Sequence, residues 1–218
     1  MNTDKQSFNL DFKSQNILFI SMIAFFILGA LLMSLKSNKE IFLILNGDQG
    51  VFIDQFFRYA TYLGDGIFYA VIFILLLFIR YGYALDFAFS AGVSTLFVQS
   101  GKRLIFADAK RPLSELGSEL VHMVEGVDVH MARSFPSGHS TSAMLIFFFL
   151  ALIVKNKFLK FLMLVLAFLG GYSRIYLSQH FFKDVYAGFA IATLSILIIA
   201  LVRNKIGEPK WYRSKIQF

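Results

Sequence analysis

The chain has 218 residues, of which 57% are hydrophobic, with 27 phenylalanines and no cysteine. This composition and a mean hydropathy of +0.64 lie outside the range of soluble domains and indicate an integral membrane protein, while the lack of cysteine excludes disulfides, thiolate catalysis and cysteine-ligated metals. The formal net charge of +7 must therefore be interpreted from where the cations lie relative to a bilayer.

Six apolar runs approach or reach the length of about 17–25 residues that a helix needs to cross a bilayer. In chain order they are 16–35, 66–79, 84–101, 138–154, 158–173 and 185–202. The third run is the weakest candidate for a membrane span, because the charged residue Asp86 lies near its start. Between the first two, the apolar positions of 51–59 predict a short helix in the membrane interface. We expect an all-α polytopic membrane protein with six transmembrane helices and a short interfacial helix, forming a single domain over 1–218.

Six spans place both termini on the same side of the membrane. The short loop KNKFLK (155–160) and the tail RNKIGEPKWYRSK (203–215) are rich in Lys and Arg, which marks the cytoplasmic side of a bacterial-type plasma (inner) membrane. We expect the basic tail 203–218 to contact lipid headgroups in the bilayer surface rather than nucleic acid. The polar stretch 102–137 then faces the periplasm or the cell exterior.

Three polar clusters fall on this outer face. The first, KRLIFADAKRP (102–112), holds four cations, and Pro112 biases Arg111 toward an extended conformation. The second, SFPSGHS (134–140), opens a helix, whose first N–H groups favour an anion. The third, SRIYLSQHFFKD (173–184), stands between two apolar runs. A polar turn at the lipid surface explains its Arg and Lys well, but explains His180 followed four residues later by Asp184 less well.

These clusters combine cations with two imidazoles, a set of groups suited to phosphoryl transfer. A guanidinium binds two phosphate oxygens at once, which an ammonium cannot do, and positioning with charge neutralisation supplies most of the catalysis. One imidazole can attack phosphorus while the other protonates the leaving oxygen. On a helix His180 and Asp184 share a face, so the carboxylate can fix the ring tautomer. Arg174 and His180 require a turn between them, and YLSQ (176–179) is the candidate.

The three clusters resemble the motifs of the type 2 phosphatidic acid phosphatase (PAP2) superfamily, which are Lys…Arg-Pro, Pro-Ser-Gly-His and Ser-Arg-x5-His-x3-Asp. Residues 136–139 match the second motif, and 173–184 match the third with the family spacing. The resemblance spans about residues 50–202. It implies a PAP2-like helical core and a metal-independent membrane lipid phosphatase that needs no cofactor. Such a hydrolase acts on a lipid phosphomonoester or diphosphate.

The resemblance also implies a role for each matched residue. His180 forms a phosphohistidine and Asp184 orients it, while His139 is the general acid for the leaving group. The groups implied to bind the phosphoryl oxygens are Lys102, Arg111, Arg174, Ser137 and the Gly138 amide. The first motif departs from the family's Lys-x6-Arg-Pro, because position 104 is Leu. Lys102 is the favoured cation and Arg103 stays an alternative. The resemblance also implies that no metal is required, which suits a chain with no set of metal ligands outside the motifs.

Several features match no motif. His122 and His130 are expected to be solvated loop residues, and Arg133 is either a substrate contact or a headgroup anchor. The substrate stays open among undecaprenyl diphosphate, phosphatidylglycerol phosphate, phosphatidic acid and lipid A phosphates, as does the oligomeric state. The alternative function is a catalytically silent binder or transporter of lipid phosphates. The presence of His139, His180 and Asp184 argues against it, because a silent binder does not need these groups. A vanadate-dependent haloperoxidase is disfavoured, because those relatives are soluble.

Overall fold

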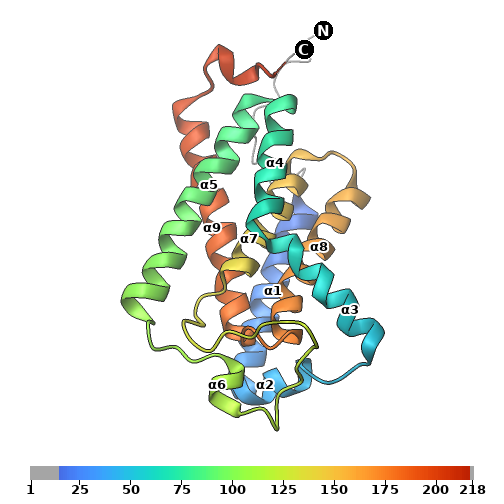
Figure 1. Cartoon of the computed structure of the whole chain (residues 1–218). Helices are drawn as coiled ribbons and strands as arrows, with labels where there is room; N and C mark the ends of the chain where they lie inside the picture. The colour runs from blue at the N-terminus through green and yellow to red at the C-terminus, as the bar shows by residue number, and fades with distance from the viewer. Residues whose placement is uncertain (1–14, 217–218) are drawn as a thin grey trace.

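The computed structural model describes residues 15–216, which form a bundle of helices without strands (Figure 1). The six long helices are α1 (Asn16–Leu35), α4 (Gly66–Ile79), α5 (Tyr81–Ser100), α7 (Gly138–Ile153), α8 (Lys157–Tyr176) and α9 (Phe182–Ile206). Shorter segments connect them or follow them: α2 (Asn38–Leu45), α3 (Val51–Ala60), the 3-10 turn η1 (Thr61–Gly64), the π turn η2 (Gly101–Ile105), α6 (Pro112–Leu116) and the 3-10 turn η3 (Lys210–Arg213).

Each of the six predicted apolar runs forms one of the long helices, which confirms the all-α membrane fold. By length and composition, α1, α8 and α9 qualify as membrane spans among the described residues. The segment Val51–Gly64 joins α4 as a fourth candidate, bent by 50°. α4 and α7 have 14 and 16 residues, which at the helical rise gives about 21 and 24 Å, less than the hydrocarbon thickness of about 30 Å. The count of six spans is therefore not confirmed.

The predicted interfacial helix is present as α3. Val51, Phe52 and Tyr59 expose their side chains, whereas Phe57 is buried against α8. In Figure 1, α3 lies at the same end of the bundle as α2 and α6, and slopes toward the start of α4. An amphipathic helix in this position suits the membrane interface, which stays a prediction.

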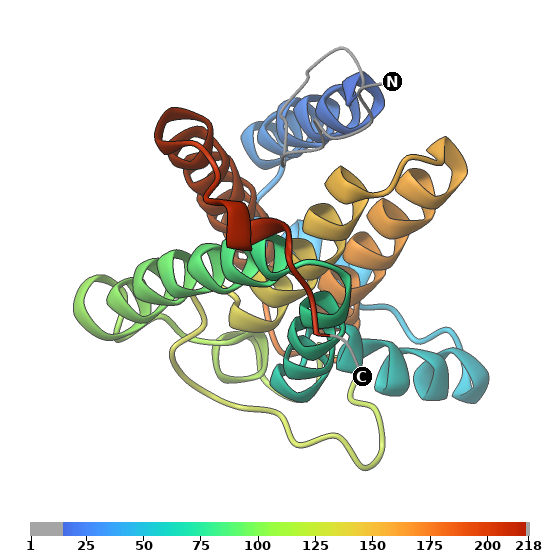
Figure 2. The same ribbon diagram turned by 90° about the horizontal axis from the view of Figure 1, so that it is seen from above.

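The core of the bundle is built around α7. Eleven of its 16 residues are buried, as expected of a helix that is apolar all round. It packs against α5, α8 and α9, which surround it when the molecule is viewed along the bundle (Figure 2). At Gly188 of α9, a Cβ would lie 2.7 Å from the Ser137 carbonyl oxygen, so glycine lets the second turn of α9 approach the start of α7. This close approach brings the second and third sequence motifs together.

The apolar run that contains Asp86 forms a helix because the carboxylate is paired inside the protein. Asp86 Oδ1 accepts hydrogen bonds from Arg203 Nη2 at 3.0 Å and from the Tyr212 hydroxyl at 2.8 Å. Tyr212 belongs to η3, which folds back so that its ring packs against Gly82. The described part of the basic tail therefore closes one end of the bundle, a role that the sequence did not predict.

The two ends of the bundle differ in character. The polar segment 102–137 lies at one end with α2 and α6, and the start of α1 lies with η3 at the other (Figure 1). The three predicted clusters are thus separated from the basic tail by the length of the bundle. Which end faces the cytoplasm stays a prediction from the placement of Lys and Arg.

Candidate active site

The three sequence clusters meet at the end of the bundle where α7 and α9 begin. The Ser137 amide donates to the Asp184 carbonyl at 3.0 Å, which joins the second cluster to the third. Arg111 of the first cluster donates to Gln179 of the third. The structure thus brings together residues that are far apart in the sequence.

A turn between Arg174 and His180 brings these two residues to the same site, as predicted. α8 ends at Tyr176, and Ser178 adopts the left-handed conformation with φ of 60°. The amides of Gln179 and His180 both donate to the Arg174 carbonyl, at 2.9 and 3.0 Å. The chain therefore reverses within YLSQ and returns His180 beside the end of α8.

His180 and Asp184 form a buried pair, with Nδ1 and Oδ2 3.4 Å apart. The same carboxylate oxygen accepts from the Ser134 hydroxyl at 2.5 Å and from the Phe181 amide at 3.0 Å. Burial, reinforced by the positive charges of Arg111 and Arg174, holds the pKa of His180 well below its usual value. The ring is therefore neutral at physiological pH, as a nucleophile requires.

Ser134 is a member of the site that the sequence did not assign. Its hydroxyl lies between the two partners, bonded to Asp184 and 3.5 Å from His180 Nδ1. The residue stands two positions before the Pro-Ser-Gly-His motif, inside the second polar cluster. This closeness to the motif was the one feature of the sequence that could have pointed to Ser134. A serine beside a motif does not, however, predict a hydrogen bond to an aspartate of another helix.

The Arg111 guanidinium is held by loop and turn atoms. Pro112 gives Arg111 the predicted extended backbone, with φ of −90° and ψ of 164°. Nε donates to the Ala132 carbonyl at 2.9 Å, and Nη1 donates to the Gln179 carbonyl and side-chain oxygen at 2.9 and 3.2 Å. These bonds fix the plane of the guanidinium, so that Gln179 acts as a positioning residue for Arg111.

Arg174 is buried and only part of its hydrogen-bonding capacity is used. Nη1 donates to the Thr61 hydroxyl at 2.6 Å. Nε is buried and has no hydrogen-bond partner in the described part of the chain, and the same holds for Asp184 Oδ1. An unpaired buried donor costs about 1–3 kcal/mol. An arginine Nε left in this state suits an anionic ligand that would supply the missing acceptor.

Of the two cations proposed for the first motif, Lys102 is the less exposed, although both line the same basic cavity. The end of α5 continues into a π turn, in which the Phe106 amide donates to the Gly101 carbonyl at 2.8 Å. Lys102 is half-buried and donates to the Arg133 carbonyl at 3.1 Å, whereas Arg103 is exposed. Burial, with the positive charge of Arg111 next, lowers the pKa of Lys102 to about 8.

The second motif forms the start of α7. The Ser137 hydroxyl is fully buried and caps the helix, accepting from the Ser140 amide at 3.3 Å. The predicted contact of Ser137 with a phosphoryl oxygen stays a prediction, because its hydroxyl is already used to cap α7. Gly138 is the first helical residue, so its amide belongs to the turn whose N–H groups lack an intrahelical acceptor. That amide suits an anion.

His139 lies on the open side of the site, with 42% of its side chain exposed. Its Nε2 is 3.9 Å from Asp65 Oδ2, and the other Asp65 oxygen caps α4 by accepting from the Ile67 amide. A Cβ at Gly64 would collide with the His139 carbonyl oxygen, so glycine permits this approach. Neither Asp65 nor Thr61 was predicted from the sequence, because both stand far from the motifs in the chain.

Two cavities adjoin these residues. One, of about 290 Å³, lies among α4, α5 and α7 and reaches Gly138. Apolar and small polar side chains line most of it, among them Tyr69, Ala91, Val98 and Leu145. The other, of about 560 Å³, is basic, and its lining includes Lys102, Arg103, Arg111 and Arg133. A largely apolar cavity and a cationic one, which share Gln99 in their linings, suit a ligand with a hydrocarbon chain and an anionic head.

The three unassigned loop residues differ from one another. His130 is exposed, as expected, and lines the basic cavity. His122 is not a freely solvated residue, which corrects the prediction: only 14% of its side chain is exposed, and Nε2 lies 2.8 Å from Asp54 Oδ1. Arg133 is exposed, with φ of 55°, and contributes its carbonyl to Lys102.

The fold and the site define a class, namely helical membrane proteins that gather a histidine–aspartate pair and several cations at one end of the bundle. Within that class the chain belongs to the PAP2 superfamily, whose family model matches residues 21–208. A curated relative, phosphatidylglycerophosphatase B of Bacillus subtilis (strain 168), is 36% identical over 91 residues. That alignment covers 38% of this chain and 43% of the relative, so the chain matches less than half of the relative's length.

Two solved structures are similar to this chain. Aquifex aeolicus LpxE superposes with a TM-score of 0.66 and 29% identity, covering 73% of this chain and 92% of LpxE. A transmembrane PAP2-type phosphatidylglycerolphosphate phosphatase from Bacillus subtilis gives a TM-score of 0.62 over 87% of this chain and 97% of its own. At 24% identity the second likeness shows the fold alone. Both agree with the helical membrane fold described above.

Proposed function

We propose that the protein is a membrane lipid phosphatase that hydrolyses a lipid phosphomonoester or diphosphate through a phosphohistidine at His180, without a metal. The observation that carries the proposal is the buried His180–Asp184 pair, whose Nδ1 and Oδ2 are 3.4 Å apart, close to Arg111 and the partly unpaired Arg174. Membership of the PAP2 superfamily and the phosphatase name of the B. subtilis relative support a phosphatase.

His180 is suited to nucleophilic attack through its second ring nitrogen. With Nδ1 turned to Asp184, the proton resides on that nitrogen and the lone pair resides on Nε2. Nε2 attacks phosphorus and forms a P–N bond while the P–O bond to the leaving group breaks. Asp184 compensates the positive charge that the ring then carries. Ser134 and the Phe181 amide hold the carboxylate in place.

His139 is suited to proton transfer at the leaving oxygen, because it lies on the open side of the site. In the first step it donates a proton to the leaving alcohol or phosphate. In the second it takes a proton from the water that attacks the phosphohistidine, which releases inorganic phosphate and restores His180. Lys102, Arg111 and Arg174 balance the charge on the phosphoryl oxygens in both steps, with the Gly138 amide as a further donor.

The two cavities support a lipid substrate. The apolar cavity at Gly138 suits a hydrocarbon chain, and the basic cavity lined by Lys102 and Arg111 suits the phosphorylated head. The phosphoryl group would then lie between them, beside the start of α7. From the placement of Lys and Arg, we assign this end to the periplasmic or exterior face and the termini to the cytoplasm.

The test is phosphate release by the detergent-purified protein from a panel of lipid phosphates in the presence of EDTA. The panel holds undecaprenyl diphosphate, phosphatidylglycerol phosphate, phosphatidic acid and a lipid A phosphate. We expect release without added metal, inhibition by vanadate, and near-complete loss in His180→Ala. Lys183→Ala is the matched control, because Lys183 is an exposed cation of the same motif region.

Three results would contradict parts of this proposal. A strict requirement for a divalent cation would exclude the metal-free mechanism. Wild-type rates in His180→Ala would exclude His180 as the nucleophile. If no lipid phosphate on the panel were hydrolysed, the silent binder of lipid phosphates would become the better description.

A further inference from the structure

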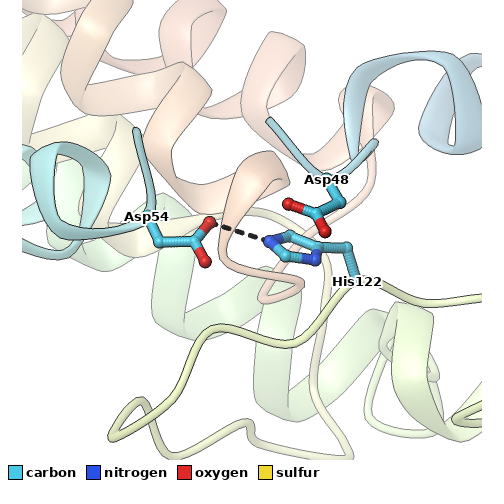
Figure 3. Close-up of side chains that lie close together, drawn as sticks. All are labelled: Asp48, Asp54 and His122. Atoms are coloured by element: carbon cyan, nitrogen blue, oxygen red, sulfur yellow. Dashed lines mark hydrogen bonds and ion pairs between the residues drawn. The ribbon is translucent and has the colours of Figure 1, made fainter. Parts of the chain in front are cut away.

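Three side chains of the kinds that bind metals lie together outside the catalytic centre (Figure 3). They are Asp48, Asp54 and His122, and one ligand atom from each lies within 4.8 Å of the others. Asp48 belongs to the loop after α2, Asp54 to the first turn of α3, and His122 to the loop after α6. The expectation that no such set stands outside the motifs is therefore wrong, because residues far apart in the sequence assemble it.

We propose that this cluster is a binding site for a divalent cation of the zinc type. Its donors are one imidazole nitrogen and two carboxylates. Magnesium and calcium take oxygen ligands, whereas imidazole suits zinc and the later first-row metals. Three protein ligands with a water in the fourth position is a recurrent zinc arrangement.

The present geometry is close to what zinc needs. Zinc ligands at about 2.0–2.2 Å in a tetrahedron lie about 3.4 Å from one another. His122 Nε2 and Asp54 Oδ1 are 2.8 Å apart, so these two already approach the same point. In Figure 3 the two carboxylates approach the imidazole from different sides. Asp48 is exposed in its loop, where its carboxylate is free to adjust, and the ligand atoms of all three residues already lie within 4.8 Å of one another.

The neighbouring groups hold two of the ligands in place. The Tyr176 hydroxyl donates to Asp54 Oδ1 at 2.6 Å, and the Asn46 side-chain oxygen accepts from the His122 amide at 2.9 Å. Ser178 donates its hydroxyl to the His122 carbonyl at 2.5 Å. Such outer partners orient metal ligands and tune their affinity. They distinguish this cluster from a chance meeting of exposed side chains.

The site would act on the structure rather than on the chemical step. Tyr176 and Ser178 belong to the segment between Arg174 and His180, which shapes the candidate active site. A cation bound by Asp48, Asp54 and His122 would tie the loop after α6 to the start of α3 and, through Tyr176, to the end of α8. Binding is therefore expected to stabilise the folded protein, and to occur equally in a catalytically inactive His180→Ala variant.

The experiment is a calorimetric titration of the full chain in detergent with ZnCl2, after treatment with EDTA and removal of the chelator. We expect one equivalent to bind. At an excess of about 100 times the dissociation constant, the unfolding midpoint should rise by about 5–10 °C. MgCl2 should produce no such rise at the same concentration. His180→Ala should bind zinc like the wild type.

Variants separate this site from adventitious binding. His122→Ala and Asp48→Asn should each weaken zinc binding by at least about tenfold. Asp48→Asn should preserve the fold, because an asparagine oxygen can still accept from the Gly50 amide, as Asp48 does. His130→Ala is the matched control, since it removes an exposed histidine from the same loop and should leave binding unchanged.

Several outcomes would overturn the proposal. They are an absence of zinc binding, binding that survives in Asp48→Asn and His122→Ala, or binding that His130→Ala abolishes to the same extent. In the first case the cluster would be a hydrogen-bonded pair of His122 and Asp54 alone. None of these results depends on phosphate release, so the zinc site and the proposed phosphatase activity can fail separately.

Discussion

Asp65 faces the histidine of the Pro-Ser-Gly-His motif, with Oδ2 3.9 Å from His139 Nε2. The carboxylate has two functions in the fold, because its other oxygen caps α4 through the Ile67 amide. Burial, with the positive charge of Arg174 next, lowers the pKa of His139 to about 4, and the negative charge of Asp65 opposes this shift in favour of the protonated imidazole that a general acid requires. Asp65 is thus a positioning residue for His139 in the proposed mechanism, much as Asp184 is for His180.

Asp65→Asn separates the charge of this residue from its capping role. Asparagine caps helices as well as aspartate does, so the unfolding midpoint should stay within about 1–2 °C of the wild type. The loss of charge should lower kcat by about tenfold and leave KM nearly unchanged, because His139 acts in proton transfer. Steady-state phosphate release measures both constants. Asp65→Ala should also lose the cap and about 1 kcal/mol of stability. Wild-type kcat in Asp65→Asn would exclude the positioning role.

The lowered pKa of Lys102 predicts the alkaline limit of activity. Burial lowers this pKa to about 8, so Lys102 is charged below that pH and neutral above it. If the ammonium binds phosphoryl oxygens, kcat/KM should fall as the pH rises through about 8, because kcat/KM reports the free enzyme. Lys102→Arg keeps its charge throughout this range and should move the fall to higher pH. Superimposable pH profiles of the two proteins would contradict this.

Arg174 should tolerate no replacement by lysine. Its Nη1 is bound to Thr61 and its Nε is buried without a partner among the described residues, so a single ammonium cannot reproduce both contacts. Arg174→Lys should lower kcat by about 10²–10³, as the loss of an oxyanion donor does. Arg103→Lys is the matched control at an exposed position and should change kcat less than twofold. A large effect at Arg103 with none at Arg174 would reverse the assignment of phosphate ligands.

The sequence predicts the parts of this site that depend on local spacing. The fixed spacing of residues within Ser-Arg-x5-His-x3-Asp predicted both the turn at YLSQ and the pairing of His180 with Asp184. Pro112 gave the extended backbone of Arg111, because that effect acts on the adjacent residue. The six apolar runs gave the long helices, because hydrophobic length is a local property.

What the sequence could not predict depends on contacts between distant segments. Ser134, Thr61 and Asp65 reach the site through the packing of α7, α9 and η1, and no local pattern encodes those meetings. Asp86 made the third apolar run the weakest candidate for a membrane span. The pairing that offsets its charge could not be predicted, because Arg203 stands near the other end of the chain. The number of spans stays unconfirmed for a different reason, since α4 and α7, with 14 and 16 residues, are shorter than a bilayer is thick.

The pairing of Asp86 with Arg203 and Tyr212 should contribute to stability without affecting catalysis. Asp86 has 1% of its surface exposed, and Arg203 Nε and Nη2 both donate to its Oδ1, at 3.1 and 3.0 Å. Asp86→Ala leaves the guanidinium without its partner in a largely buried position, at a cost of about 3 kcal/mol. For a chain of this size, that lowers the unfolding midpoint by about 6–12 °C.

Thermal unfolding in detergent measures this effect, and phosphate release at a temperature well below the midpoint should match the wild type. Lys205→Ala is the matched control, because it removes an exposed cation from the same last turn of α9 and should shift the midpoint by less than about 2 °C. The double variant Asp86→Leu with Arg203→Met should be more stable than Asp86→Ala, since an apolar pair leaves no charge unpaired. Equal midpoints for Asp86→Ala and the wild type would show that the pair, although buried, contributes nothing to holding η3 against α5.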